Sequence, residues 1–311
     1  MVIALFSQEI NESVSNVIES FFSSKHAKHS KFFLENKIFN NFKSDNNLEL
    51  ISFSKSEDLD SSIDIMVSIG GDGTFLRSIE FIRDLDIPVM GINTGNLGFL
   101  ATIKKENIEQ SIEKIYTQKF KTENRSIIKV NHKEIGLPKS VFPYALNEIS
   151  VVRKDTTSMI NINTSLDGNH LNSYWADGLI VSTPTGSTGY SLSCGGPVIS
   201  PTSGSFVLTP ISPHNLNARP LVISDETKIE LSVSGREENH LLSIDSKIFT
   251  LKNNTKINIE KSDFEFKIAH FSNHNFYKTL KEKLLWGKDK KNKIKEKKKL
   301  YILFSINDFY I

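Results

Sequence analysis

Cysteine is nearly absent from this sequence, since Cys194 is the only one among 311 residues. A single cysteine excludes an internal disulfide framework and any metal site built from several thiolates. Such a chain suits a reducing compartment, and we expect it in the cytoplasm.

Long apolar runs are also missing. No stretch approaches the roughly 20 residues that a membrane-spanning helix needs. The start, Met1 to Phe6, has neither the basic segment nor the long apolar segment of a secretory signal. We therefore expect no membrane partner.

Excess charge is confined to the C-terminal end. The formal net charge is +2, but ten of the 38 basic and three of the 36 acidic residues lie between Lys281 and Lys299. The rest of the chain carries 28 basic against 33 acidic residues, a balance of about −5 that gives no general attraction to nucleic acid. Residues 286–311 are predicted to form a Lys-rich, solvated and poorly ordered tail.

The first 120 residues alternate short apolar runs with amphipathic helical patterns, which predicts an α/β domain with a parallel sheet. Strands are expected at Val2–Phe6, Ile63–Ile69 and Pro88–Ile92. Helices are expected around Val14–Phe22, after Thr74 as N-cap, and around Ile108–Tyr116.

From about Lys121 the apolar residues alternate with polar ones, which is typical of half-buried strands. Asp167-Gly168 is a hairpin-turn signal. Strands are expected at 160–166, 179–182, 206–209, 229–233, 241–244 and 264–268. The sequence thus predicts an α/β domain at 1–120 and a predominantly β domain at 121–285, before the tail.

A glycine-rich turn, Gly70-Gly71-Asp72-Gly73-Thr74, follows the apolar run at 63–68. Glycines let backbone N–H groups approach an anion, and the start of a helix adds partial positive charge, so the turn suits phosphate. Asp72 would repel phosphate unless it binds a metal ion or accepts a proton, which indicates chemistry as well as binding. The alternative is a purely structural turn whose Asp caps the helix. Arg77, one helical turn later, faces either the ligand or solvent.

Two further motifs carry polar groups suited to a nucleotide. The segment from Thr183 to Ser193 is rich in hydroxyls and glycines and too polar for a core, and Tyr190 adds a ring on which a base can lie. In Asn147-Glu148, an amide beside a carboxylate can read ribose hydroxyls or an adenine edge. Cys194 has no base next to it in sequence, so we interpret it as a small structural residue.

In order and spacing, these motifs and the segment Asn93–Leu100 resemble the NAD kinase family over roughly residues 60–270. The Gly-Gly-Asp-Gly turn is shared with diacylglycerol and sphingosine kinases, whereas the Thr-Pro-Thr-Gly-Ser-Thr block is the more discriminating part. The resemblance implies the NAD kinase/diacylglycerol kinase-like fold and a homo-oligomer, dimer or tetramer.

The resemblance also implies the reaction, in which ATP phosphorylates the 2′-hydroxyl of the adenosine ribose of NAD and Asp72 accepts the proton. A divalent ion, Mg²⁺, is expected to be held mainly by the ATP phosphates, and no residue is assigned as a metal ligand. The candidate nucleotide-binding residues are Asp72, Gly73, Arg77, Asn147, Glu148, Asp177, Thr188, Gly189, Tyr190, Ser191, Leu192 and Ser193.

At a few positions the chain differs from the residues that are most common in the family motifs. Gly189 stands where alanine is usual, a change that preserves small size. Trp175 stands where some members have a basic residue, and Ser158 and Lys247 fall where identity varies, so these three are not counted as contacts.

Two other functions remain open at this point. A lipid kinase of the diacylglycerol or sphingosine type shares the glycine turn but should lack the block from Asp177 to Ser193. A nucleotide sensor without catalysis would bind phosphate better without the charge of Asp72.

Overall fold

In the computed structural model the described residues are 1–43, 47–95, 98–138, 140–155, 158–272 and 275–285. Met1–Ser272 form one compact unit and Asn273–Ile311 a second. The predicted Lys-rich tail at 286–311 lies outside the described residues. Within the described part of the chain, no helix has the length and apolarity to cross a membrane.

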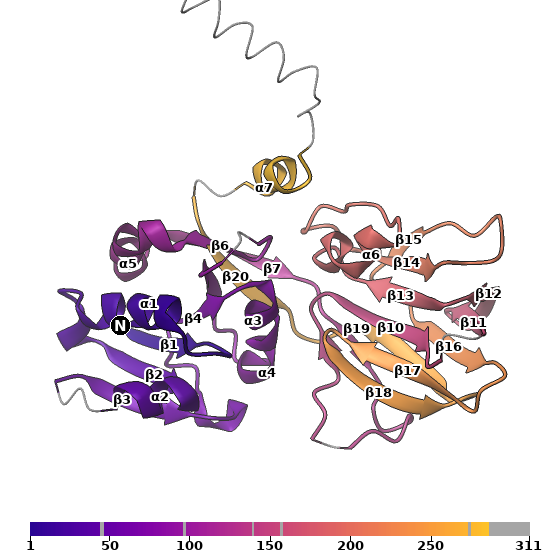
Figure 1. The fold of residues 1–311 in the computed structure, drawn as a ribbon, viewed down its shortest axis with the longest axis horizontal. Helices are drawn as coiled ribbons and strands as arrows, with labels where there is room; N and C mark the ends of the chain where they lie inside the picture. Colours follow the sequence, from indigo (N-terminus) through magenta and orange to yellow (C-terminus); the bar gives the residue numbers. More distant parts are fainter. Residues whose placement is uncertain (44–46, 96–97, 139, 156–157, 273–274, 286–311) are drawn as a thin grey trace, which may run out of the picture. The chain divides into compact units, whose positions relative to one another are not determined.

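The N-terminal part is built on one sheet with helices on both faces (Figure 1). Its elements are β1 (Val2–Phe6), α1 (Glu12–Phe22), β2 (Lys31–Glu35), α2 (Asn36–Phe42), β3 (Glu49–Phe53), β4 (Ile65–Gly70), α3 (Asp72–Arg77), α4 (Ile79–Ile82), β5 (Val89–Asn93), β6 (Ala101–Lys104), α5 (Ile108–Tyr116) and β7 (Phe120–Arg125), with 3-10 turns at Ala27–His29, Ser56–Asp58 and Lys105–Asn107. The strand order is β3-β2-β1-β4-β5-β20-β7, and β6 also pairs with β5. All neighbours are parallel except β7, which runs antiparallel to β20 (Phe266–Phe271).

Alternating residues of β1 belong to two buried apolar clusters, one on each face of this sheet. Ile3 and Leu5 pack in the cluster that includes α1 and α5, whereas Ala4 and Phe6 pack in the cluster that includes α3 and α4. This two-sided burial explains the continuous apolar runs that predicted a parallel sheet.

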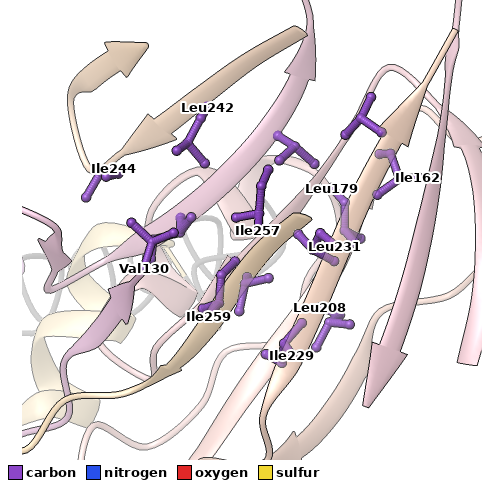
Figure 2. Close-up of a cluster of buried hydrophobic side chains, with 14 of the residues drawn as sticks. Val130, Ile162, Leu179, Leu208, Ile229, Leu231, Leu242, Ile244, Ile257 and Ile259 are labelled. Carbon is purple, nitrogen blue, oxygen red and sulfur yellow. The ribbon is translucent and has the colours of Figure 1, made fainter. Parts of the chain in front are cut away.

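The second half is predominantly β. Its elements are β8 (Ile128–Val130), β9 (Tyr144–Ala145), β10 (Glu148–Arg153), β11 (Ile160–Leu166), β12 (Asn169–Ala176), β13 (Gly178–Ser182), a 3-10 turn η4 (Gly186–Thr188), α6 (Tyr190–Ser193), β14 (Ser205–Ile211), β15 (Leu221–Ser224), β16 (Ile229–Ser234), β17 (Asn239–Ile244), β18 (Lys247–Lys252) and β19 (Lys256–Lys261). Two six-stranded sheets have the orders β15-β14-β13-β10-β17-β18 and β12-β11-β16-β19-β8-β9. Inward residues such as Leu179, Leu231 and Leu242 share one core (Figure 2).

The predicted fold class is confirmed, with one correction to the grouping of strands. The run at 264–268, expected among the strands of the second half, contributes to β20, which pairs with β5 and β7 of the first sheet. The chain thus returns to the first sheet after building the β half. The boundary near residue 120 stays a prediction.

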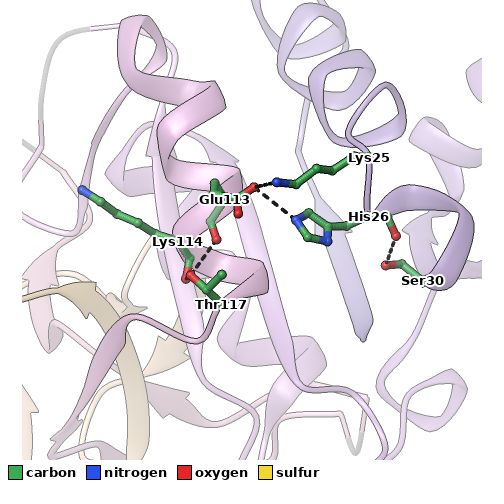
Figure 3. A network of polar contacts seen from close by, with 6 residues as sticks. All are labelled: Lys25, His26, Ser30, Glu113, Lys114 and Thr117. Carbon is green, nitrogen blue, oxygen red and sulfur yellow. Dashed lines mark hydrogen bonds and ion pairs between the residues drawn. The ribbon is translucent and has the colours of Figure 1, made fainter.

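The turn after α1 is tied to α5 by polar contacts at the surface (Figure 3). Glu113 accepts from Lys25 (3.2 Å) and His26 (3.1 Å), and these two partners lower the pKa of the Glu113 carboxyl. Because the side chains are exposed, such pairs contribute little to stability.

The second unit contains one described helix, α7 (Phe276–Lys283). Its N-cap is Asn275, whose side chain accepts hydrogen bonds from the backbone N–H groups of Tyr277 and Lys278.

Candidate active site

The glycine turn closes β4 and opens α3. Gly71 precedes the helix in an extended conformation, and Asp72 is the first helical residue. The Asp72 carboxylate reaches the loop after β5, where it accepts backbone hydrogen bonds from Phe99 (2.7 Å), Leu100 (3.1 Å) and Ala101 (2.9 Å). The aspartate therefore joins the ends of two parallel strands instead of capping its own helix.

The loop approaches the acid closely because it has no side chain at Gly98. A β-carbon there would overlap with the Asp72 carboxylate. The three N–H groups and the bare backbone thus hold the carboxylate in one place while Asp72 stays partly exposed. Residues 96 and 97 of the predicted segment 93–100 lie outside the described residues.

The turn lies at the point where the strand order reverses. β1 and β4 are neighbours, although β2 and β3 come between them in the chain. In open α/β sheets, ligands bind outside the carboxyl ends of the strands at such a point. Thr74 was predicted as the N-cap but lies inside α3, where its hydroxyl donates to Gln8, just after β1, at 3.3 Å. The two strand ends are therefore joined directly.

A hollow of about 400 Å³ opens at the ends of β1 and β2, beside α3 and α4. Lys37 and the exposed Arg77 line it, and Lys37 donates to the backbone oxygen of Gln8 at 2.8 Å. The acidic residues of the same wall are Glu9, Glu35 and Glu80. The structure thus places Arg77 in the wall of this hollow among mixed charges, and its contact with a nucleotide stays a prediction.

The Asn147–Glu148 pair lies where β10 begins. Asn147 Oδ1 and Glu148 Oε2 are buried and have no hydrogen-bond partner among the described residues, and the same holds for Thr185 Oγ1 nearby in the hydroxyl-rich block. Because buried polar atoms are nearly always hydrogen-bonded in folded proteins, these three oxygens indicate a ligand or water that completes the site.

One buried cluster ties the pair to the glycine turn. Phe75 of α3, Leu100 of the loop that binds Asp72, and Leu146 just before the pair belong to the same apolar cluster. Phe75 and Leu146 are fully buried. Packing therefore holds motifs that are far apart in sequence around a common core.

Some hydroxyls of the hydroxyl-rich block, residues 183–193, form hydrogen bonds inside the protein and do not face a ligand. The hydroxyl of Ser187 donates to the backbone oxygen of Pro184 (2.7 Å), and that of Ser191 shares a hydrogen bond with Thr209 (2.8 Å). Both serines are fully buried. The interpretation of the whole segment as too polar for a core is thus wrong in part, because backbone carbonyls and other hydroxyls satisfy these groups.

Other residues of the block remain at the surface of the site. Tyr190 is exposed over 44% of its area, and Thr188, Gly189 and Leu192 are partly exposed, whereas Ser193 is exposed. A β-carbon at Gly189 would lie 3.2 Å from Glu148 Oε2, so the missing methyl group leaves room beside that carboxyl.

Another close approach joins the block to the Asn147–Glu148 pair. A β-carbon on Gly186 would overlap with the backbone of Asn147. The block is therefore packed directly against the pair.

Asp177 stands just before β13 and pairs with Arg153 across the sheet, at 3.1 Å from Nε. Trp175, two residues earlier, is 48% exposed, and its ring centroid lies 4.6 Å from that of His214. Burial raises the pKa of the Tyr190 hydroxyl, and the negative charge of Asp177 adds to this rise. The candidate acid is thus part of an ion pair near the ring that is predicted to hold a base.

Two half-buried acidic residues, Glu148 and Asp245, set the electrostatics of the site. Burial, together with the nearby charge of Asp245, raises the pKa of Glu148 to about 8. Burial also raises the pKa of Asp245 to about 6, against the effect of three backbone hydrogen bonds that favour its anion. Glu148 is therefore protonated at neutral pH and can donate a hydrogen bond, which an ionised carboxylate cannot do.

Sequence reasoning missed Asp245. Its only sequence signal is a polar residue between two strands, and the structure shows it at a hairpin turn with a positive φ of 49°. Lys247, not counted as a contact, forms an ion pair with Glu80 of α4. This pair links the hairpin to the helical segment that follows the glycine turn.

Sequence profiles of two domains match the chain. The ATP-NAD kinase N-terminal domain matches residues 4–120, and the ATP-NAD kinase C-terminal domain matches residues 146–271. Together these ranges cover most of the described chain.

Relatives and solved structures agree with the profiles. An NAD kinase of Christiangramia forsetii is 56% identical over 77% of this chain and 82% of its own length, and one of Flavobacterium psychrophilum is 47% identical over 94% and 100%. An Archaeoglobus fulgidus NAD kinase in complex with ATP is similar with a TM-score of 0.68 and 28% identity, covering 90% of this chain and 97% of that one. Yeast NADH kinase complexed with NADH shares the fold, with a TM-score of 0.82 and 22% identity over 93% and 89% of the two chains.

Proposed function

The chain belongs to the NAD kinase family, and from this premise we propose that Asp72 accepts the proton of the adenosine 2′-hydroxyl of NAD while ATP donates the phosphoryl group. As an NAD kinase, the protein converts NAD to NADP. The lipid kinase and the sensor without catalysis are no longer needed as alternatives, because the relatives that match along the whole chain are NAD kinases.

This proposal rests on the Asp72 carboxylate, which backbone hydrogen bonds hold in one orientation at the glycine turn. Three backbone N–H groups orient Asp72, and Oδ2, which accepts only the N–H of Phe99, keeps a lone pair for a proton. As the 2′-oxygen forms its bond to the γ-phosphorus, the bond from that phosphorus to the bridging oxygen of ADP breaks and the hydroxyl proton passes to Asp72. A positioned base of this kind contributes roughly 10²–10⁴-fold to the rate.

The place proposed for ATP is the crevice at the ends of β1 and β4. The strand order reverses there, and the neighbouring hollow at the ends of β1 and β2 has Lys37 and Arg77 in its wall. The similar Archaeoglobus protein was solved in complex with ATP, which supports the same donor here.

The proposed Mg²⁺ would be carried mainly by the ATP phosphates and would offset their charge. The described residues contain no group of three or more His, Cys, Asp or Glu side chains that could hold a metal ion. The residues around the glycine turn fit an ion that arrives with its nucleotide better than one kept in a protein cage.

For NAD, the proposed contacts begin at the Asn147–Glu148 pair. Asn147 Oδ1 can accept a ribose hydroxyl, and the protonated Glu148 can donate to a ribose oxygen. Tyr190 offers a partly exposed ring to a base. The other proposed nucleotide contacts are Gly73, Arg77, Asp177, Thr188, Gly189, Ser191, Leu192 and Ser193, of which Ser191 is buried and would act through the shape of the turn.

The test of the catalytic role is Asp72→Asn. The amide keeps one oxygen for the N–H groups of Leu100 and Ala101 but cannot take up a proton, so we expect turnover to fall at least about 100-fold with NAD still bound. The measurement is a coupled NADP assay, with NAD binding followed by calorimetry.

The matched control is Asp64→Asn on the same sheet. Its carboxylate also accepts a backbone N–H, that of Val2 at 2.7 Å, but it lies outside the glycine turn. The control should keep its turnover. Retained NADP formation by the Asp72 variant would refute the assigned role.

We also propose a cytoplasmic location, which the single cysteine suits, and a homo-oligomer of two or four chains, which family membership suggests. Light scattering of the purified protein measures the second directly, and a mass of one chain would contradict it.

A further inference from the structure

Asp245 lies between two parts of the proposed site, the Asn147–Glu148 pair and the helical segment that begins at Asp72. It stands in the turn between β17 and β18 and is half-buried. Its carboxylate accepts backbone hydrogen bonds from Leu146 (2.9 Å), Asn147 (2.9 Å) and Glu148 (3.0 Å). In return, its own backbone N–H donates to the carbonyl of Glu148 at 2.9 Å. A single side chain thus holds three consecutive residues where β10 begins.

The same hairpin is fastened to the segment that carries the proposed base. Lys247, two residues on, pairs with Glu80 of α4, which follows directly on α3. A small hollow of about 20 Å³, large enough for one water molecule, lies between Arg77 and Glu80 on one side and Asp245 on the other. The hairpin therefore bridges the element that begins at Asp72 and the Asn147–Glu148 pair.

We propose that Asp245 is a positioning residue of the NAD kinase reaction: its half-buried carboxylate holds the start of β10, and with it the Asn147–Glu148 pair, against the ribose of NAD. The inference rests on the ribose-binding role proposed for that pair. Asp245 touches neither substrate, and it acts through the backbone that it holds and through its charge on Glu148.

The charge of Asp245 has a second consequence for the pair. Together with burial, it raises the pKa of Glu148 and so keeps that side chain protonated as a donor. The other charged groups around Asp245 are Glu80, which raises its pKa, and Lys247 and Arg77, which line the adjoining hollow with Tyr144. Removing the charge of Asp245 should let Glu148 ionise at a lower pH.

The test is Asp245→Asn in the full-length enzyme. Asparagine tolerates the positive φ of the turn and keeps one oxygen for Asn147 and Glu148, but its NH₂ group would face the N–H of Leu146. We expect the KM for NAD to rise about tenfold, which corresponds to roughly 1.4 kcal/mol. The kcat should change much less, because Asp72 is untouched.

The pH dependence of the KM for NAD distinguishes a positioning role of Asp245 from a purely structural one. In the wild-type enzyme the KM for NAD should rise as the pH passes about 8, where Glu148 loses its proton, and in the variant this rise should begin at a lower pH. The matched control is Asp167→Asn, another hairpin aspartate with a φ of 48° that accepts one backbone N–H, from Lys228. The control should leave both KM and the pH profile unchanged.

Combined variants test the route of the effect. In the double variant of Asn147→Ala with Glu148→Gln, adding Asp245→Asn should raise KM no further. Additive losses, or an unchanged KM in a stable Asp245→Asn protein, would overturn the positioning role while leaving the proposed function intact. If the double variant itself binds NAD normally, the ribose-binding role fails first, and the inference falls with it.

Should Asp245→Asn unfold, the pair Glu80→Gln and Lys247→Met loosens the hairpin without removing the three backbone hydrogen bonds. We then expect a two- to threefold rise in KM for NAD in a folded protein, on the order of half a kcal/mol. An unchanged KM in that protein would count against the bridge.

Discussion

Glu148 is predicted to lower the stability of the unliganded enzyme, so Glu148→Gln should raise it. The carboxyl is buried beside Asp245, which raises its pKa from 4.5 to about 8, and its Oε2 has no partner among the described residues. The folded protein must therefore hold a proton that the unfolded chain has already released at neutral pH. Gln has a similar shape and never ionises, which removes this cost.

The magnitude follows from proton linkage. Because the folded pKa lies above the unfolded value, the folded state binds the extra proton, and stability falls as pH rises from 4.5 to about 8. Each pH unit in this window costs about 1.4 kcal/mol, so the penalty at pH 7 is on the order of 3 kcal/mol. At pH 5 it falls to about 1 kcal/mol. The variant should therefore be stabilised strongly at pH 7 and only slightly at pH 5.

The assay is thermal or denaturant unfolding of both proteins at pH 5 and pH 7, with NAD binding measured on the same samples. At pH 7 the variant should melt several degrees higher, at roughly 2–4 °C per kcal/mol for a chain of this size. Glu57→Gln is the control, because Glu57 is exposed and its pKa is lowered by backbone and Arg83 contacts, so its replacement should not stabilise the protein. Equal stability of wild type and Glu148→Gln at pH 7, or a gain that is the same at pH 5, would refute the reasoning.

Two further predictions concern His240 and Tyr190. Burial lowers the pKa of His240 below 6.5, so its contribution to stability is present above pH 6.5 and lost as the pH falls below it. His240→Gln should therefore make the unfolding midpoint less sensitive to acid between pH 7 and pH 5. An unchanged dependence of the midpoint on pH would contradict this. Tyr190 is 44% exposed and its ring can meet a base, so Tyr190→Phe should bind NAD almost normally. Tyr190→Ala should lose about tenfold in NAD affinity, measured by calorimetry, because the ring on which the base stacks is gone. Equal NAD binding by both variants would show that no base stacks there.

Several parts of the fold could be predicted because their cause is local. The runs at Val2–Phe6 and Ile63–Ile69 are largely apolar because both faces of the first sheet are covered, and the alternation at 160–166 reflects a strand with one buried face. Strands β2 and β3, with α2 between them, were not predicted. Membership of β20 in the first sheet depends on long-range pairing, which no local pattern records.

By itself the sequence determined which motifs the site contains, because glycines, a lone acid at a turn and an amide–carboxyl pair have chemistry that does not depend on their neighbours. Only the tertiary structure decided how they act. It turned Asp72 toward three loop amides, buried Ser187 and Ser191 in internal hydrogen bonds, and placed Asp245 beneath the Asn147–Glu148 pair. The reason is physical: burial, hydrogen-bond partners and pKa depend on groups from distant parts of the chain. These groups meet only in the folded protein, where the eight-stranded sheet and the two six-stranded sheets have formed.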